Sequence, residues 1–346
     1  MAIIHPSTAI SAKVHAKFGH RLTKNDYQNL IECKNVSDVV LYLKNNTHYS
    51  SVFTKINEYC VHRGKVEQLL KQKLFYDFDS LCRYDPKSGV NFSHHIVRRY
   101  EIDQLIHFLT LLNSDNTERY IFMLPSYFKK HTNIDLQGLA RARTYEDVLN
   151  ATSNSPYKKI LSKFAPNKDN KVNIQAIENA MYNFMYDELY NTIQKNKSKK
   201  EREDIKKLFD TLNDFKNIEK IYRIKNFYNV DLTTLKKFLL PFGTINQNKL
   251  IKICQAETDE DMLSELRTTS IGKLIDKGSV NSLSSIFLKA RFNLLYHNMF
   301  LAESPTVVMF SYIFITDIEL SNIINIIEGV RYGLIPSEIE QIIICK

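Results

Sequence analysis

The sequence predicts an all-α protein in which one helical unit occurs three times. Only 9 glycines and 8 prolines interrupt 346 residues, and so few breakers favour long helices over a many-turned β architecture. Apolar residues recur at helical spacing in several segments, and one helix–bend–helix pattern returns three times in the same order. A single core stops growing at about 250–300 residues, so we expect more than one packed unit.

The first hundred residues are expected to form helices separated by polar turns. Thr23 is a plausible N-cap because Asp26 lies three residues later, as in a capping box. Residues 55–79 are expected to form one exposed amphipathic helix or a helix pair. The segment 93–112 carries apolar residues at helical spacing and ends in the turn cluster 113–116. The expected helices lie at about residues 9–18, 23–33, 37–44, 55–79 and 93–112.

Later helices are expected to alternate with charged or glycine-containing turns. A Tyr- and Met-rich helix over 174–193 runs into the charge run 195–203, which we expect to be a solvated helix end or connection, with a basic binding patch as the alternative. The apolar stretch 305–327 is interrupted by polar residues, so we expect a buried helix rather than a membrane span, with strand ambiguity over 307–315. Turns are expected at Gly243, Gly278, Gly329 and Gly333.

The net charge and the cysteines indicate which partners and which cellular compartment to expect. The net charge of +9 is explained by a Lys-rich soluble chain, with attraction to an anionic partner as the alternative. Basic residues are spread along the chain, so we expect no nucleic-acid partner. The five cysteines form no C-x-x-C pair, which fits a reducing cytoplasm, and residues 1–11 contain no apolar signal-peptide core.

The sequence contains no motif that predicts catalysis. There is no Gly-rich phosphate loop and no Gly-x-Ser-x-Gly, so we expect neither ATP binding nor any other cofactor. His94, His95 and His131 have no Cys or carboxylate at ligand spacing beside them, so we expect no metal site. Glu101 and Asp103 are two residues apart on a helix, on different faces, which favours structural roles.

The repeated pattern occurs at residues 30–40, 139–149 and 253–263. In each copy a helix ends on a large apolar residue, a small residue follows at the bend, and an acidic residue falls in the first turn of the next helix, where the helix dipole favours it. The small residues are Cys33, Ala142 and Ala256, and the acidic residues are Asp38, Asp147 and Asp261. The copies run on to closing segments at 47–49, 155–157 and 268–270, followed by Phe53, Leu161 and Ile275.

A second element recurs at 101–106, 217–222 and 319–324, beginning with Glu101, Asn217 and Glu319. The chain is therefore expected to cycle through one helical unit three times, with an offset at both ends. We expect Glu101 and Glu319 to lie at equivalent bends and to pair with a basic residue. The local candidates are Arg98 and Arg99.

Four segments carry a resemblance to a known family: residues 9–49, 99–105, 221–228 and 317–338. In their order and spacing they resemble the central-stalk C subunit of A-type and bacterial V-type ATPases, which is called the d subunit in eukaryotic V-ATPases. The resemblance implies three helical units arranged as a funnel around a central cavity. The expected units are 1–110, 111–225 and 226–346.

The resemblance also implies a function. By this resemblance we expect a non-catalytic subunit of a bacterial V/A-type rotary ATPase, which would lie at the cytoplasmic face of the membrane without spanning it. Such a protein couples the central shaft to the membrane rotor ring of proteolipid subunits, for proton or sodium ion transport. Shared repeat positions are then expected to be structural: Arg99, Glu101, Glu319, Asp38, Asp147 and Asp261.

Two other functions remain open from the sequence. A helical-repeat scaffold unrelated to ATPases would stack its units evenly in an open array. A basic nucleic-acid-binding protein would bind random duplex DNA in a salt-dependent manner.

Overall fold

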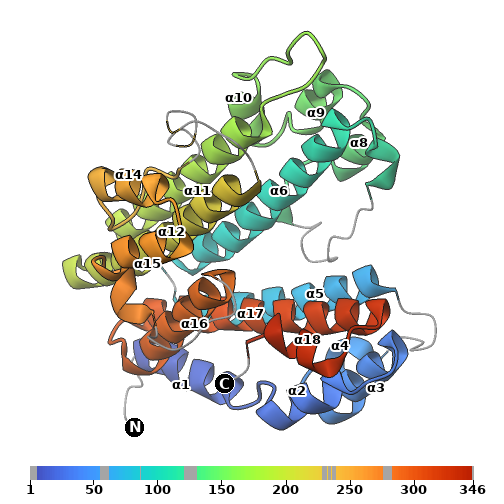
Figure 1. The fold of residues 1–346 in the computed structure, drawn as a ribbon, viewed down its shortest axis with the longest axis vertical. Helices are drawn as coiled ribbons and strands as arrows, with labels where there is room; N and C mark the ends of the chain where they lie inside the picture. The colour runs from blue at the N-terminus through green and yellow to red at the C-terminus, as the bar shows by residue number, and fades with distance from the viewer. Residues whose placement is uncertain are drawn as a thin grey trace.

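The computed structural model describes residues 6–54, 62–85, 87–120, 131–227, 232, 235, 239–275 and 283–344. Every regular element in these ranges is a helix, which confirms the prediction of an all-α protein (Figure 1). Two of the elements are short 3-10 helices, named η2 and η3.

The elements alternate between groups of short helices and long ones. The short elements are α2 (Lys24–Ile31), α3 (Val36–Asn46), α4 (Ser50–Phe53), η2 (Thr117–Arg119), α8 (Leu136–Arg141), α9 (Tyr145–Ala151), α10 (Tyr157–Leu161), α14 (Gln247–Gln255), α15 (Asp259–Arg267), η3 (Ile271–Leu274) and α18 (Pro336–Gln341). The longer helices are α1 (Pro6–Phe18), α5 (Arg63–Cys82), α6 (Gly89–Asn113), α11 (Ile174–Asn196), α12 (Lys199–Phe227), α16 (Leu283–Leu301) and α17 (Pro305–Tyr332).

Helix α17 joins the two ends of the chain. It packs against α16, which precedes it, and against α1 and α5 from the N-terminal part. In Figure 1 the helices form two groups. One contains α1, α5, α16 and α17 with α2 to α4, and the other contains α6, α11 and α12. The C-terminal helix therefore completes a core with residues at the start of the chain.

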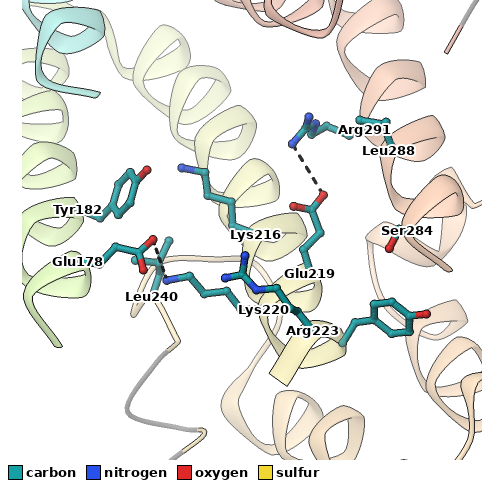
Figure 2. Close-up of a pocket in the computed structure, with 11 residues that line it drawn as sticks. Glu178, Tyr182, Lys216, Glu219, Lys220, Arg223, Leu240, Ser284, Leu288 and Arg291 are labelled. Carbon is teal, nitrogen blue, oxygen red and sulfur yellow. Dashed lines mark ion pairs between the residues drawn. The ribbon is translucent and has the colours of Figure 1, made fainter. Parts of the chain in front are cut away.

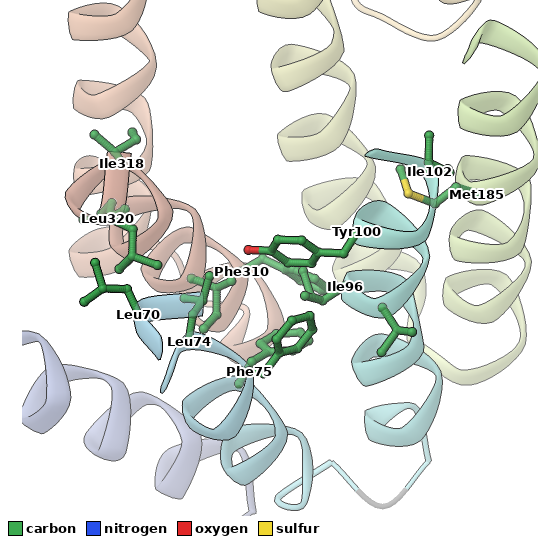
Figure 3. Packing of buried hydrophobic residues seen from close by; sticks show 14 of the residues in the cluster. Leu70, Leu74, Phe75, Ile96, Tyr100, Ile102, Met185, Phe310, Ile318 and Leu320 are labelled. Carbon is green, nitrogen blue, oxygen red and sulfur yellow. The ribbon is translucent and has the colours of Figure 1, made fainter. Parts of the chain in front are cut away.

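An aromatic cluster connects the long helices. Phe310 of α17 meets Phe78 of α5, Phe92 of α6 and Phe209 of α12, with ring centroids 5.5, 5.2 and 5.0 Å apart. Figure 3 shows this packing, in which Phe310 and residues of α5 and α6 face one another. Buried aromatic pairs add stabilisation beyond their area, so this cluster ties four long helices together.

The predicted helix starts are confirmed at the repeated bends. Thr23 and Asp26 form a capping box at α2, Thr144 and Asp147 form one at α9, and Thr258 and Asp261 form one at α15. At α3 the side chain of Asn35 accepts a hydrogen bond from the backbone N–H of Asp38. Each cap satisfies backbone N–H groups that the first helical turn leaves without partners.

Several expectations for local structure were wrong. The segment expected to be exposed contains α5, which buries Val66, Leu70 and Leu74, because α5 is covered by α6 and α17; residues 55–61 lie outside the described part. By contrast, the buried helix expected over 305–327 is confirmed, and α17 is helical through residues 307–315, where the sequence left a strand as the alternative. Gly329 lies within α17, where a Cβ would stand 2.7 Å from Ile339 of α18, so packing and not a turn requires glycine.

Of the other three glycines expected at turns, the structure describes two. Gly243 and Gly333 both have positive φ angles, 154° and 69°, as turns that favour glycine do. Gly278 lies outside the described residues.

Helix α17 is also long and apolar enough to cross a membrane, contrary to the expectation from its polar interruptions. It is the one such helix in the described ranges, and 72% of its most apolar window is buried inside the protein. Its hydrophobicity is thus explained by its position in the core.

Candidate functional site

The long helices enclose a hollow lined by charged side chains. A cavity of about 540 Å³ lies between α11, α12 and α16, and another of about 300 Å³ lies between α5, α6 and α17. A narrow cavity between them shares Lys216 and Arg291 with the first and Arg99 and Asp317 with the second. We call these three adjoining cavities the charged hollow.

An ion pair between α6 and α17 lies in the middle of the charged hollow. Arg99 Nη2 lies 2.8 Å from Asp317 Oδ2, and this carboxylate holds the pKa of Arg99 well above its usual range. One turn along α6, Asp103 accepts a 3.2 Å hydrogen bond from the hydroxyl of Tyr182 on α11. The side chain of Asp103 is exposed, yet burial raises its pKa. Solvent thus reaches Asp103 although protein surrounds it, as expected in a water-accessible hollow.

Lys216 projects from α12 into the same space. Its Nζ lies 3.4 Å from the hydroxyl oxygen of Tyr186 and 4.3 Å from the ring centroid of Tyr182, toward which it extends in Figure 2. Desolvation, followed by the positive charge of Arg99, lowers the pKa of Lys216 to about 7.

The α12–α16 side of the hollow has more positive than negative groups. The cations are Lys216, Lys220, Arg223 and Arg291, and the carboxylates are Glu178 and Glu219. The ion pairs that join them are long, with 3.8 Å between Lys220 and Glu178 and 3.8 Å between Arg291 and Glu219 (Figure 2). Desolvation lowers the pKa of Lys220 as well.

The two repeated glutamates each lie against the closing segment of a repeat. Glu319 accepts a hydrogen bond of 2.7 Å from the hydroxyl of Tyr49 and one of 3.1 Å from the backbone N–H of Leu22. Burial raises the pKa of Glu319. Glu101 accepts bonds of 2.8 Å from Tyr157 and 2.6 Å from Thr132. The two sites share a buried carboxylate that fastens a long helix to a group of short ones.

Arg98, rather than Arg99, is the basic partner of Glu101. Its guanidinium lies 3.0 Å from Glu101 and 3.1 Å from Glu188 of α11. The pairing expected for Glu101 is confirmed with one of the two arginines that the sequence offered. Glu319 accepts the two hydrogen bonds described above, and the positive charge of Arg21 acts on its carboxylate.

The third copy uses different residues for the same fastening. Asn217 bonds both backbone groups of Leu240, accepting from its N–H at 2.8 Å and donating to its carbonyl at 3.1 Å. One turn earlier, Asp214 accepts bonds from the backbone N–H and the hydroxyl of Thr244. Fully buried Ile271 stands four residues before Ile275, as Tyr49 stands four before Phe53.

The closing segment of this third copy is therefore shifted by one residue. It spans 269–271 rather than the expected 268–270, with Ile271 at the position of the tyrosine. The signal that could have found this is the four-residue spacing to the following apolar residue.

The structure separates the predicted site residues into three groups. Arg99 lies in the charged hollow, and Glu101 and Glu319 are buried at the fastening points. The acidic residues in the first turns of short helices have local roles. Asp147 and Asp261 complete capping boxes, whereas Asp38 accepts a hydrogen bond from the side-chain amide of Asn35, which is the cap of α3.

The cations of α12 were missed as candidates. Lys216, Lys220 and Arg223 recur at the spacing that places residues on one helix face, and this was the available signal. Arg291 comes from α16, so only the tertiary fold brings it to them.

The described residues contain no group of three or more His, Cys, Asp or Glu side chains that could hold a metal ion. Burial lowers the pKa of His95 to about 3, so this imidazole is neutral, and its ring packs edge-on against Phe209.

Comparison with known proteins identifies the family. The chain matches the family described as ATP synthase (C/AC39) subunit over residues 10–342. It is 23% identical over 280 residues to the A-type ATP synthase C subunit of Methanosphaera stadtmanae, covering 78% of this chain and 68% of that protein.

Two further relatives agree with this match. The A-type ATP synthase C subunit of Pyrococcus furiosus is 20% identical over 286 residues, which cover 80% of this chain and 74% of that protein. The V-type proton ATPase d subunit of Saccharomyces cerevisiae is 25% identical over 182 residues, half of each chain. The chain therefore belongs to the ATP synthase (C/AC39) subunit family, whose members are non-catalytic stalk subunits of V/A-type ATPases.

Proposed function

We propose that this chain is the socket of a bacterial V/A-type rotary ATPase, receiving the central shaft and coupling it to the membrane rotor ring of proteolipid subunits. The observation that carries the proposal is the charged hollow, which six long helices line in a chain that belongs to a stalk-subunit family. A recess with solvent-accessible charges suits the insertion of a protein segment, because its polar groups can exchange water for partner groups.

The proposal includes three helical units, 1–110, 111–225 and 226–346, arranged around that hollow as a funnel. Helices α6 and α12 run across the unit boundaries, and α17 packs against α1 and α5 of the first unit. Continuous helices across the boundaries favour stiffness, because bending them strains the backbone hydrogen bonds along the helix, and a sharp kink interrupts them. A stiff body is what torque transmission between shaft and ring requires.

The position of the protein in the complex is part of the same proposal. We place it at the cytoplasmic face of the membrane, held there by the ring rather than by a membrane span of its own. Burial of α17 in the core supports this placement, because that helix is already packed against α1, α5, α12 and α16 as well as short helices. The transported ion, proton or sodium, is determined by other subunits.

Affinity purification tests the function. The full chain, carrying a tag and expressed in the cells that make it, is purified from detergent-solubilised membranes, and its stably bound partners are identified by mass spectrometry. We expect shaft subunits and the proteolipid ring among them. A set of partners without any ATPase component would overturn the proposal, and it would favour a scaffold function in another system.

A further inference from the structure

We propose that the α12–α16 side of the charged hollow binds a row of acidic side chains on a helix of the partner that enters it. This inference rests on the proposed function and adds the chemistry and the orientation of the contact. It concerns Lys216, Lys220 and Arg223 of α12 with Arg291 of α16, which we call the basic wall.

The three α12 residues of the basic wall form a line. They stand at positions i, i+4 and i+7, which place side chains above one another on one helix face. At 1.5 Å per residue, seven residues extend about 10 Å along the axis. Figure 2 shows their side chains directed into the cavity that α11 and α16 border. Acidic residues at the same spacing on a partner helix would match this line.

The positive charge of the basic wall is only partly compensated. Lys220 and Arg291 share two long ion pairs with Glu178 and Glu219. Among the described residues, no carboxylate comes within 4.0 Å of the terminal nitrogens of Lys216 or Arg223. Within the described part of the chain, these two side chains thus lack a close carboxylate, and acidic groups of a partner would supply the opposite charge.

The opposite side of the hollow differs in charge. Between α5, α6 and α17, the cations and carboxylates are equal in number: Arg63, Lys71 and Arg99 against Glu67, Asp103 and Asp317. The ion pair between Arg99 and Asp317 is short, at 2.8 Å. Excess positive charge is therefore confined to the basic wall, so the acidic face of an inserted helix would turn toward α12 and α16.

The titration behaviour of the wall agrees with this geometry. The pKa of Lys216 falls to about 7 because the amine is desolvated among other cations. An acidic partner would reverse that effect by supplying opposite charge nearby. A small polyanion is the other possible ligand, but it would require cations that converge on one point rather than a line along a helix.

The test compares two charge-matched variants of the full chain in membranes. The wall variant is Lys216→Gln, Lys220→Gln and Arg223→Gln. The control variant is Lys158→Gln, Lys159→Gln and Lys163→Gln, which neutralises three exposed lysines at and beside α10. Each lowers the net charge by three. Retention of shaft subunits is measured after washes between about 50 and 500 mM salt, which screen exposed charges increasingly.

We expect the wild type and the control to retain shaft subunits at low salt and the wall variant to lose them about tenfold, with a weaker salt dependence. Arg223→Gln alone checks against misfolding, because Arg223 is exposed. It should give part of the loss, and Arg223→Lys should restore binding in part.

Three outcomes separate the possibilities. Equal retention by the wall variant and the wild type would overturn the basic wall and leave the proposed function standing. Absence of shaft subunits from the wild type would overturn the proposed function itself. Saturable thermal stabilisation of the isolated chain by inorganic pyrophosphate, lost in the wall variant while shaft retention is unchanged, would overturn the acidic helix in favour of a small polyanion.

Discussion

The hydroxyl of Tyr49 donates a 2.7 Å hydrogen bond to the carboxylate of Glu319, joining residues that are 270 positions apart. Both groups are buried. The bond fastens α17, near the C-terminus, to the short helices at the N-terminus. An equivalent bond joins Tyr157 to Glu101, within the middle of the chain.

Removing the Tyr49 hydroxyl should destabilise the fold. In Tyr49→Phe, Glu319 loses one of its two described hydrogen bonds and keeps the one from the backbone N–H of Leu22. Leaving a buried acceptor without a donor lowers the free energy of unfolding by about 1–3 kcal/mol. Chemical denaturation followed by circular dichroism measures the loss. The control is Tyr76→Phe, because Tyr76 is 46% exposed and its loss should be below about 0.5 kcal/mol. Equal midpoints for both variants would contradict a role for the bond.

Glu319 should make stability depend on pH. Burial raises its pKa in the folded state above that of the unfolded chain, about 4.3. The folded state therefore favours the protonated carboxyl, and this contribution is complete below the unfolded pKa and is lost as pH rises through the folded one.

Glu319→Gln should remove this pH dependence while keeping both contacts. Its amide oxygen can accept from Leu22 N–H, and its amide nitrogen can donate to Tyr49 once that hydroxyl reverses its role. Denaturation midpoints from about pH 4 to pH 8 should fall less in the variant than in the wild type. Parallel curves for the two proteins would show that another group governs this pH range.

Gly243 should tolerate no side chain. Its φ is +154°, and a Cβ would stand 2.2 Å from Oδ1 of Asp214, which holds Thr244. Gly243→Ala should lower stability by about 2 kcal/mol or more, since backbone strain of about 1–3 kcal/mol adds to the clash. Gly333→Ala is the control, because it also has positive φ but no atom within 4 Å of a Cβ. Thermal unfolding should rank Gly243→Ala below Gly333→Ala, and the reverse order would contradict the third fastening point.

The amine of Lys216 should titrate near neutrality. Arg99 lowers its pKa, so Arg99→Gln should raise it, whereas Asp103→Asn should lower it further. NMR of isotopically labelled lysine measures both shifts, and unchanged titration in both variants would contradict the charged hollow. The charged and titratable groups around this amine are Arg99, Asp103, Tyr182, Tyr186, Lys220, Arg291 and Asp317.

The local part of the fold could be predicted from the sequence, because it depends on neighbouring residues. The caps at Thr144 and Thr258 follow from a hydroxyl and an acid three residues apart. The helical class follows from spacing and from the scarcity of breakers. The recurrence of Glu101 and Glu319 pointed to equivalent environments, and their tyrosine partners lay in segments already recognised as repeats.

The burial of the helices and the make-up of the charged hollow could not be predicted, because they depend on contacts between segments that are distant in the sequence. Burial of α5 arises because α17 covers it, more than 200 residues later in the chain, and spacing within α5 cannot show this. The charged hollow draws residues from six helices, so its composition follows only from their packing. The substitution of Asp214 and Asn217 for a glutamate is equally non-local, since their partners lie in the segment 240–245.

Photo-crosslinking from inside the hollow tests the central claim most directly. A benzophenone amino acid replaces Arg223 in one full-length variant and Lys159, which is exposed outside the hollow, in another. After irradiation of intact membranes, adducts are identified by mass spectrometry. A socket predicts a covalent adduct between position 223 and a shaft subunit of the ATPase, with none from position 159. Shaft adducts from position 159 alone, or none from either position in membranes that contain the assembled ATPase, would contradict it.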